Sequence, residues 1–339
     1  DFRYTNLWKE GDTNPSQQIP DVYCMKEIFD KMRPIYEDSK KRTAARSTDE
    51  VKCATGIAFG SYAAGLDGPD SASAWAELNE DGSVTIGAAW GDHGQGATCG
   101  ILGTAHEALR PYGIDVDRIK TPPAGPAGGS RSQVMVGNAI RVSCEMLLAA
   151  MKKPEGGWYT RAEMLEKGLN PKQEGTWTAP CKPCSSDTGK GEPFCCYMYG
   201  LFLAEVSVDV KTGKTRCDRL VCSCDIGKIN NRLIVDGQIS GGMAQGVGLA
   251  LTEDYEDLKR DSTMAGAGIP NIKDIPDDIE IIYTESPRKD GPFGASGVGE
   301  MPLTAPHAAI INGIYNACGA RIRHLPARPE KVLAAMPKK

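Results

Sequence analysis

The chain has 339 residues, of which 40% are hydrophobic and 24% charged, and its formal net charge is −5. This acidic balance excludes a broad basic surface for nucleic acid, and no apolar run reaches the ~20 residues of a membrane-spanning helix. Because no signal peptide is recognisable, we expect a cytoplasmic protein whose twelve cysteines are reduced thiols.

The first 50 residues are predicted to be a peripheral segment. Residues 1–7 alternate like a strand that needs partners, and residues 26–50 are charge-rich and compatible with a helix that Pro34 interrupts. The first residue is Asp1 rather than Met, and we therefore expect a piece of a longer polypeptide.

Residues 51–180 are predicted to form a first unit of strands and helices. The turn residues 79–82 separate two strand-like runs, which is typical of a β-hairpin. The expected elements are strands at 56–62, 73–78 and 83–89, a helix at 97–110, a strand at 114–120 and a helix at 133–152. Residues 153–196 are rich in loops and are the best candidate for an insertion or a boundary.

Residues 181–339 are predicted to form a second unit. The expected elements are a hairpin of 199–210 and 215–224, a helix at 235–252, a strand at 279–283, a helix from the N-cap Thr304 to 318, a strand at 321–325 and a helix at 329–336. Because hairpins are interleaved with helices, the sequence predicts an α+β fold with mixed sheets and packed helices.

Four glycine-rich segments, at 91–96, 125–131, 241–248 and 291–300, are the most informative part of the sequence. Glycine lets a ligand approach the main chain closely, and a helix N-terminus presents free N–H groups to phosphates and polar rings. The sequence lacks the GxGxxG and Walker patterns of common nucleotide sites. The four segments therefore predict a large ringed or phosphate-bearing ligand held mainly by backbone.

The motifs in these segments resemble those of the molybdenum hydroxylase (xanthine oxidase) family. They are Asp92-His93-Gly94-Gln95-Gly96, Gly128-Gly129-Ser130-Arg131, Met243-Ala244-Gln245-Gly246 and Gly297-Val298-Gly299-Glu300. The resemblance covers nearly the whole chain and is to the C-terminal part of the molybdopterin-binding region. Within the family it is nearest to the aldehyde oxidoreductases of sulfate-reducing bacteria. On this resemblance, residues 51–180 and 181–339 are two cofactor-binding subdomains.

The resemblance implies a function and a set of site residues. Glu300 would be the general base in the hydroxylation of an aldehyde to a carboxylic acid, with the oxygen taken from water. The residues implied to bind the cofactor are His93, Gly94, Gln95, Gly129, Ser130, Arg131, Gln245, Gly297, Val298 and Gly299. Tyr62 and Leu66 are implied to line the substrate channel, and no residue is implied to bind the metal directly.

The resemblance also implies the cofactor and the partners. The cofactor would be molybdopterin cytosine dinucleotide carrying molybdenum or tungsten, and 2Fe–2S clusters would lie in a part of the protein outside this chain. The implied partners are those other domains or companion chains, an acceptor such as ferredoxin or flavodoxin, and a second copy in a homodimer.

Three alternatives stay open from the residues. The same scaffold serves a hydroxylase of purines or other N-heterocycles. Cys181-Lys182-Pro183-Cys184, followed by Cys195 and Cys196, is compatible with a non-catalytic, cysteine-rich metal-binding subunit. Finally, 291–300 read alone is compatible with a surface loop that ends in a solvated glutamate.

Overall fold

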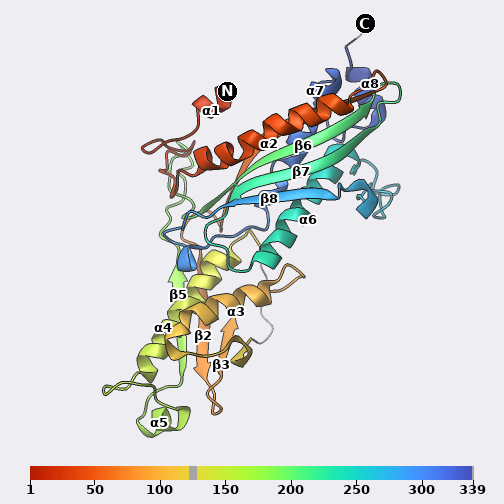
Figure 1. The fold of residues 1–339 in the computed structure, drawn as a ribbon. Helices are drawn as coiled ribbons and strands as arrows, with labels where there is room; N and C mark the ends of the chain where they lie inside the picture. Colours follow the sequence, from red (N-terminus) through yellow and green to blue (C-terminus); the bar gives the residue numbers. More distant parts are fainter. Residues whose placement is uncertain (122–127, 338–339) are drawn as a thin grey trace.

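Two four-stranded sheets organise the part of the protein that the computed structural model describes, residues 1–121 and 128–337 (Figure 1). The first sheet has the strand order β1-β6-β7-β8, and the second has the order β4-β3-β2-β5. Both sheets combine antiparallel pairs with one parallel pair, β7–β8 and β3–β4 respectively. Helices pack on both sheets, which confirms the predicted α+β class.

The first sheet is covered on both faces. Its strands are β1 (Val51–Ala63), β6 (Tyr197–Asp209), β7 (Thr215–Asp225) and β8 (Asp278–Thr284). Helix α2 (Met25–Arg46) packs on one face, and α6 (Arg232–Leu251) and α7 (Pro306–Cys318) pack on the other (Figure 1). In β6, Leu201 and Leu203 face α2, whereas Phe202 lies in the core with α6 and α7, so the strand is apolar on both sides.

The second sheet has one covered face. Its strands are β2 (Ser71–Leu78), β3 (Val84–Ala88), β4 (Ile119–Lys120) and β5 (Lys172–Thr178). The buried side chains of β2 and β3 pack in one core with α3 (Ala97–Ala108) and α4 (Gly137–Met151). The alternation of buried and partly exposed residues along β2 is the pattern of a half-buried strand.

The other helices are short. They are α1 (Phe2–Thr5), α5 (Arg161–Glu166) and α8 (Pro329–Ala335), and a π-helical turn at Ser132–Val136 leads into α4. Short 3₁₀ turns lie at Arg110–Tyr112, Val116–Arg118, Ile272–Asp274, Pro292–Gly294 and Met301–Leu303. The helix from 132 to 151 is long and apolar enough to cross a membrane by composition alone, but most of it is buried inside the protein.

Most predicted elements are present, and five local predictions were wrong, the last of which concerns Pro34. Residues 2–5 form a helical turn instead of a strand, and 321–325 are not a strand. Only the last two residues of 114–120 pair with β3, because a 3₁₀ turn occupies Val116–Arg118. The hydroxyl of Thr304 donates to the carbonyl of Met301, 2.7 Å away, and does not cap α7.

Pro34 does not interrupt α2, which continues through it. Ile28 and Met32 on its inner face are buried against the sheet, and this packing compensates for the missing backbone hydrogen bond. The predicted unit 51–180 contributes β1 to the first sheet and β2 to β5 to the second.

Candidate functional site

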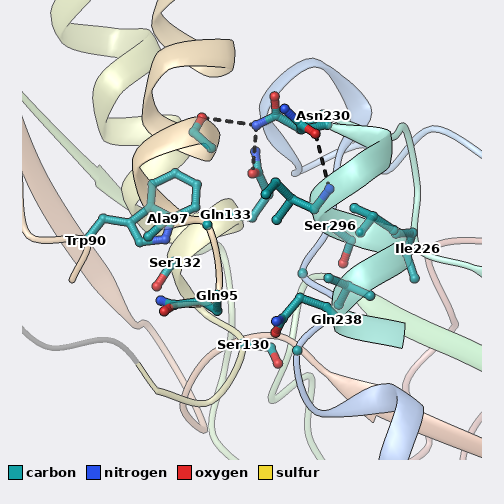
Figure 2. A pocket seen from close by; sticks show the side chains of 18 of the residues that line it. Trp90, Gln95, Ala97, Ser130, Ser132, Gln133, Ile226, Asn230, Gln238 and Ser296 are labelled. Carbon is teal, nitrogen blue, oxygen red and sulfur yellow. Dashed lines mark hydrogen bonds between the residues drawn. The ribbon is translucent and has the colours of Figure 1, made fainter. Parts of the chain in front are cut away.

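A cavity of about 620 Å³ lies where the N-terminus of α3, the N-terminal half of α6 and two loops meet (Figure 2). Three of the four glycine-rich segments contribute to its wall. The lining includes Trp90, His93, Gly94, Gln95, Gly96, Gly128, Ser130, Ser132, Gln133, Asn230, Gln238, Gly297, Val298, Gly299 and Glu300. Residues 125–127 of the second segment lie outside the described residues.

The loop before α3 is shaped by its own side chains. Asp92 accepts hydrogen bonds from the backbone N–H groups of Thr98 at 3.0 Å and Gly94 at 2.9 Å, and these bonds hold its pKa below the ordinary value. Gln95 donates to the carbonyl of Gly91 at 2.7 Å and accepts from the N–H of His93. The Gln95 amide therefore faces the cavity while also fixing the turn that begins the helix.

Residues 128–131 form the second part of the wall. Gly129 and Ser130 both have positive φ, at 61° and 50°, and the carbonyl of Gly129 accepts from the N–H of Gly65 at 3.0 Å. This turn places Gly128 and Ser130 on the cavity, whereas Gly129 lies against Gly65.

Arg131 points away from the cavity and anchors the turn. Its Nε and Nη2 atoms donate to the two carboxylate oxygens of Asp70 at 2.9 and 2.7 Å. Burial acts to raise the pKa of Asp70, but the Arg131 hydrogen bonds hold that pKa below its ordinary value. Arg131 is therefore an anchor of the turn, and its predicted contact with a cofactor stays a prediction.

The segment 297–300 contributes the only carboxylate in the described lining of the cavity, Glu300. Ser130 Oγ donates to Glu300 Oε2 at 2.7 Å and accepts from the Glu300 N–H at 3.2 Å. A Cβ atom added to Gly297 would lie 2.4 Å from the carbonyl oxygen of Ser130. Glycine at 297 is thus required for the two loops to approach each other so closely.

The two predicted channel residues differ in their surroundings. Burial, together with the charge of Glu300 and a hydrogen bond to it, raises the pKa of Tyr62, so the phenol lies beside the carboxylate. Leu66 is 61% exposed and lies next to Gly129. The structure therefore brings Tyr62 to Glu300 and leaves Leu66 at the surface.

The fourth glycine-rich segment does not reach this cavity. Gln245 lines a separate cavity of about 570 Å³, together with Leu249, Glu253 and Ile272. Gln238 faces the first cavity instead (Figure 2). Seven residues are nearly two turns, so both amides lie on one face of α6 about 10 Å apart along its axis.

Several polar residues of the cavity were missed by sequence reasoning. Asn230 donates from its side chain to Gln133 Oε1 at 3.0 Å, to Thr104 Oγ1 at 3.2 Å and to the carbonyl of Gly100 at 3.1 Å (Figure 2). This amide joins α3, the start of the 132–151 helix and the loop before α6. The sequence does carry a signal for Asn230, because the residue that follows it, Asn231, is a typical N-cap and begins α6.

The cysteines form no metal site in the described residues. All twelve are free thiols, and no three His, Cys, Asp or Glu side chains there are grouped to hold a metal ion. Cys181 and Cys195 pack at the core of the first sheet. The cavity, with its glycine-lined walls, amides and single carboxylate, defines the chain as a binding domain for a large polar cofactor next to a candidate base.

Known proteins identify that cofactor class. The molybdopterin cofactor-binding domain family matches residues 31–276. The aldehyde oxidoreductase of Megalodesulfovibrio gigas is 53% identical over 99% of this chain and 38% of its own length. The aldehyde oxidoreductase structure from Desulfovibrio desulfuricans is 66% identical, with a TM-score of 0.96, over 99% of this chain and 38% of that one. The chain belongs to the molybdopterin cofactor-binding domain of the xanthine oxidase family.

A more distant structure shares the fold alone. Quinoline 2-oxidoreductase from Pseudomonas putida 86 is 20% identical, with a TM-score of 0.78, over 97% of this chain and 48% of that one. The chain thus spans less than half the length of each of these relatives.

The cavity residues fit a molybdopterin group. Within the described residues, a Cβ atom added to Gly94 or Gly128 would meet no atom within 4 Å, so the walls leave room at both positions. The side-chain amide of Gln238 offers both donors and an acceptor, as the edges of a pterin require, whereas the amides of Gln133 and Asn230 are bonded to each other. The N-terminus of α3 adds free backbone N–H groups that suit a phosphate.

Proposed function

We propose that this chain is the catalytic part of a molybdenum-dependent aldehyde oxidoreductase. The reaction converts an aldehyde and water into a carboxylic acid, two protons and two electrons. The position of Glu300 at the cofactor cavity carries the proposal, and the 53% identity to the Megalodesulfovibrio gigas aldehyde oxidoreductase supports the choice of substrate class.

In this proposal the bound molybdenum cofactor supplies two-electron redox chemistry. Glu300 accepts the proton that water must lose before its oxygen is transferred to the aldehyde carbon. Tyr62 lies beside the carboxylate, and its raised pKa keeps the phenol protonated at neutral pH. Gln238 would hold the pterin by a polar edge, with Gln133 and Asn230 forming the wall beside it, and the glycines of 297–299 would allow its close approach.

We further propose the finer identity of the cofactor and its surroundings. The pterin carries a cytosine dinucleotide and molybdenum, with tungsten as the other metal of matching chemistry. Electrons pass to 2Fe–2S clusters in domains or chains outside these residues, and from there to ferredoxin or flavodoxin. The enzyme acts in the cytoplasm as a homodimer. The relatives' greater length supports the presence of companion domains.

The test is the Glu300→Gln variant of the whole enzyme that contains this chain. Loss of a positioned general base costs about 10²–10⁴-fold in rate, so aldehyde oxidation should fall by that factor while molybdenum and pterin contents stay unchanged. Glu155→Gln is the matched control, because Glu155 lies in an exposed turn and does not line the cavity. Retained activity in the Glu300 variant would sink the proposal, and turnover of purines in place of aldehydes would redirect it to the heterocycle hydroxylases.

A second measurement tests the cofactor form. Acid release of the bound nucleotide should yield cytidine monophosphate. Metal analysis of the same sample should give molybdenum, and tungsten or a different nucleotide would contradict the proposed form.

A further inference from the structure

The Ser130 hydroxyl contacts Glu300 at two points. It accepts from the Glu300 N–H at 3.2 Å and donates to Oε2 at 2.7 Å. A hydroxyl has one hydrogen, and accepting the backbone N–H directs that hydrogen toward the carboxylate. The two bonds close a small ring that fixes the rotamer of Glu300 against its own main chain.

The backbone at Ser130 indicates that the hydroxyl has a specific task. The residue has a φ of 50°, a left-handed conformation that glycine adopts without strain and serine does not. The preceding residue, Gly129, is a glycine at a similar φ of 61°. The turn thus keeps a strained serine at the one position that faces Glu300.

The loops around this contact are fixed independently of it. Arg131 anchors the turn through its bidentate pair with Asp70, and the N–H of Ser296 donates to the carbonyl of Ile226 at 3.0 Å on the other side. The carbonyl of Ser130 also lies against Gly297. Removing only the hydroxyl should therefore leave both loops in place while freeing the carboxylate.

We propose that Ser130 is a positioning residue for Glu300, which holds the carboxylate in one orientation at the wall of the cavity. This inference rests on the proposed role of Glu300 as the base. It gives Ser130 a different task from the cofactor contact that the sequence motif implies.

The charged and titratable groups around Glu300 come from several elements. Tyr62 faces it from β1, His93 and Lys228 share the cavity from the loops before α3 and α6, and the Asp70–Arg131 pair lies behind the Ser130 turn. These groups remain in place when only the Ser130 side chain is changed. A fall in kcat at constant KM then reports the lost hydroxyl.

The test compares Ser130→Ala and Ser130→Gly in the whole, cofactor-loaded enzyme. Both variants should keep their molybdenum and pterin. Their kcat should fall on the order of tenfold while KM for the aldehyde stays unchanged, because only the orientation of the base is lost. Alanine retains the backbone strain and glycine relieves it, so an equal fall in both assigns the effect to the hydroxyl. Ser73→Ala, on the exposed face of β2, is the control for an unrelated serine hydroxyl.

The outcomes separate this inference from the proposed function. An unchanged kcat in both variants, with Glu300→Gln inactive, overturns the role of Ser130 and leaves the base assignment standing. Loss of pterin from both variants also overturns it, because Ser130 would then hold the cofactor. Full activity of Glu300→Gln removes the proposed function itself. Should the alanine variant fail to fold, the glycine variant alone decides.

Discussion

Asp21 is a carboxylate placed where its charge is unfavourable. Its neighbour is Arg288, a fully buried arginine that also forms an ion pair with Asp225 at 2.9 Å. Asp21 Oδ2 lies 3.5 Å from Arg288 Nε. Neither carboxylate oxygen of Asp21 has a hydrogen-bond partner among the described residues. Burial is the main cause that raises the pKa of Asp21 to about 6, and the positive charge of Arg288 only partly opposes it.

The raised pKa predicts how stability changes with pH. The folded protein binds the Asp21 proton more tightly than the unfolded chain. The contribution of this proton to the free energy of unfolding is therefore fully present below about pH 4 and is lost as the pH rises through about 6. Asp21→Asn should therefore be more stable than the natural protein at pH 7.5, by on the order of 3 kcal/mol, and equal to it near pH 4. Denaturant unfolding at both pH values measures this, with the exposed Asp277→Asn as control. A less stable Asp21→Asn protein at pH 7.5 would contradict it.

The site residues differ in how visible they are in the sequence. Glu300 and Ser130 stand in glycine-rich turns, and a polar side chain in such a turn is a recognisable signal. The partner of Arg131 is Asp70, 61 positions earlier in the chain, and no local pattern reveals that pair. Gln238 and Gln245 share one face of α6, and periodicity cannot show how far along that face the cavity extends.

The contact of α7 with β1 depends on glycines in both elements. A Cβ atom added to Gly56 of β1 would lie 2.1 Å from the carbonyl oxygen of Ala309 and 2.2 Å from the backbone nitrogen of Gly313. Neither backbone atom can move without the whole helix. Asn312 and Asn316 of α7 also donate to carbonyls of β1, at 2.9 and 2.8 Å, so a shift of the helix would stretch these bonds as well.

We therefore predict that Gly56→Ala destabilises the protein by about 1–3 kcal/mol, the usual range for overpacking. Gly237 in α6 is the matched control, because an added Cβ meets no described atom within 4 Å there. Gly237→Ala should stabilise the protein by about 0.5–1 kcal/mol through helix propensity. Thermal melts of the two variants side by side check this. Equal melting temperatures would refute the close contact between α7 and β1.

Sequence patterns predicted those elements that carry their own signals. The β6–β7 pair has a turn at 211–213 between two apolar runs, and its hairpin is local. Residues 1–7 and 321–325 also alternate, but a short alternation becomes a strand only when a neighbouring strand pairs with it. None does so in the described structure. Pro34 shows the converse case, in which tertiary packing maintains a helix that the local sequence would end.

The arrangement of the whole molecule could not be read from local patterns. β1 pairs with β6 across more than 130 intervening residues, and the sheet order follows from that pairing. The α+β class could be predicted, because hairpins interleaved with helices are local signals. The cavity lies between α3, which packs with the second sheet, and α6, which packs with the first. Each core alone would supply only half of its wall.

This placement predicts that the cofactor joins the two cores. A ligand that contacts both walls stabilises the folded state by RT ln(1 + [L]/Kd), about 2.7 kcal/mol at a hundredfold excess over Kd. Extraction of the cofactor from the whole enzyme should thus lower the melting temperature by several degrees. Hydrogen exchange should rise at 97–101 and 296–300, which line the cavity from opposite cores, while α2 serves as the internal control because it packs on the far face of the first sheet. Equal increases in hydrogen exchange in α2 and in the cavity loops would contradict this prediction, because they would show that the whole protein is destabilised and not only the contact between the two cores.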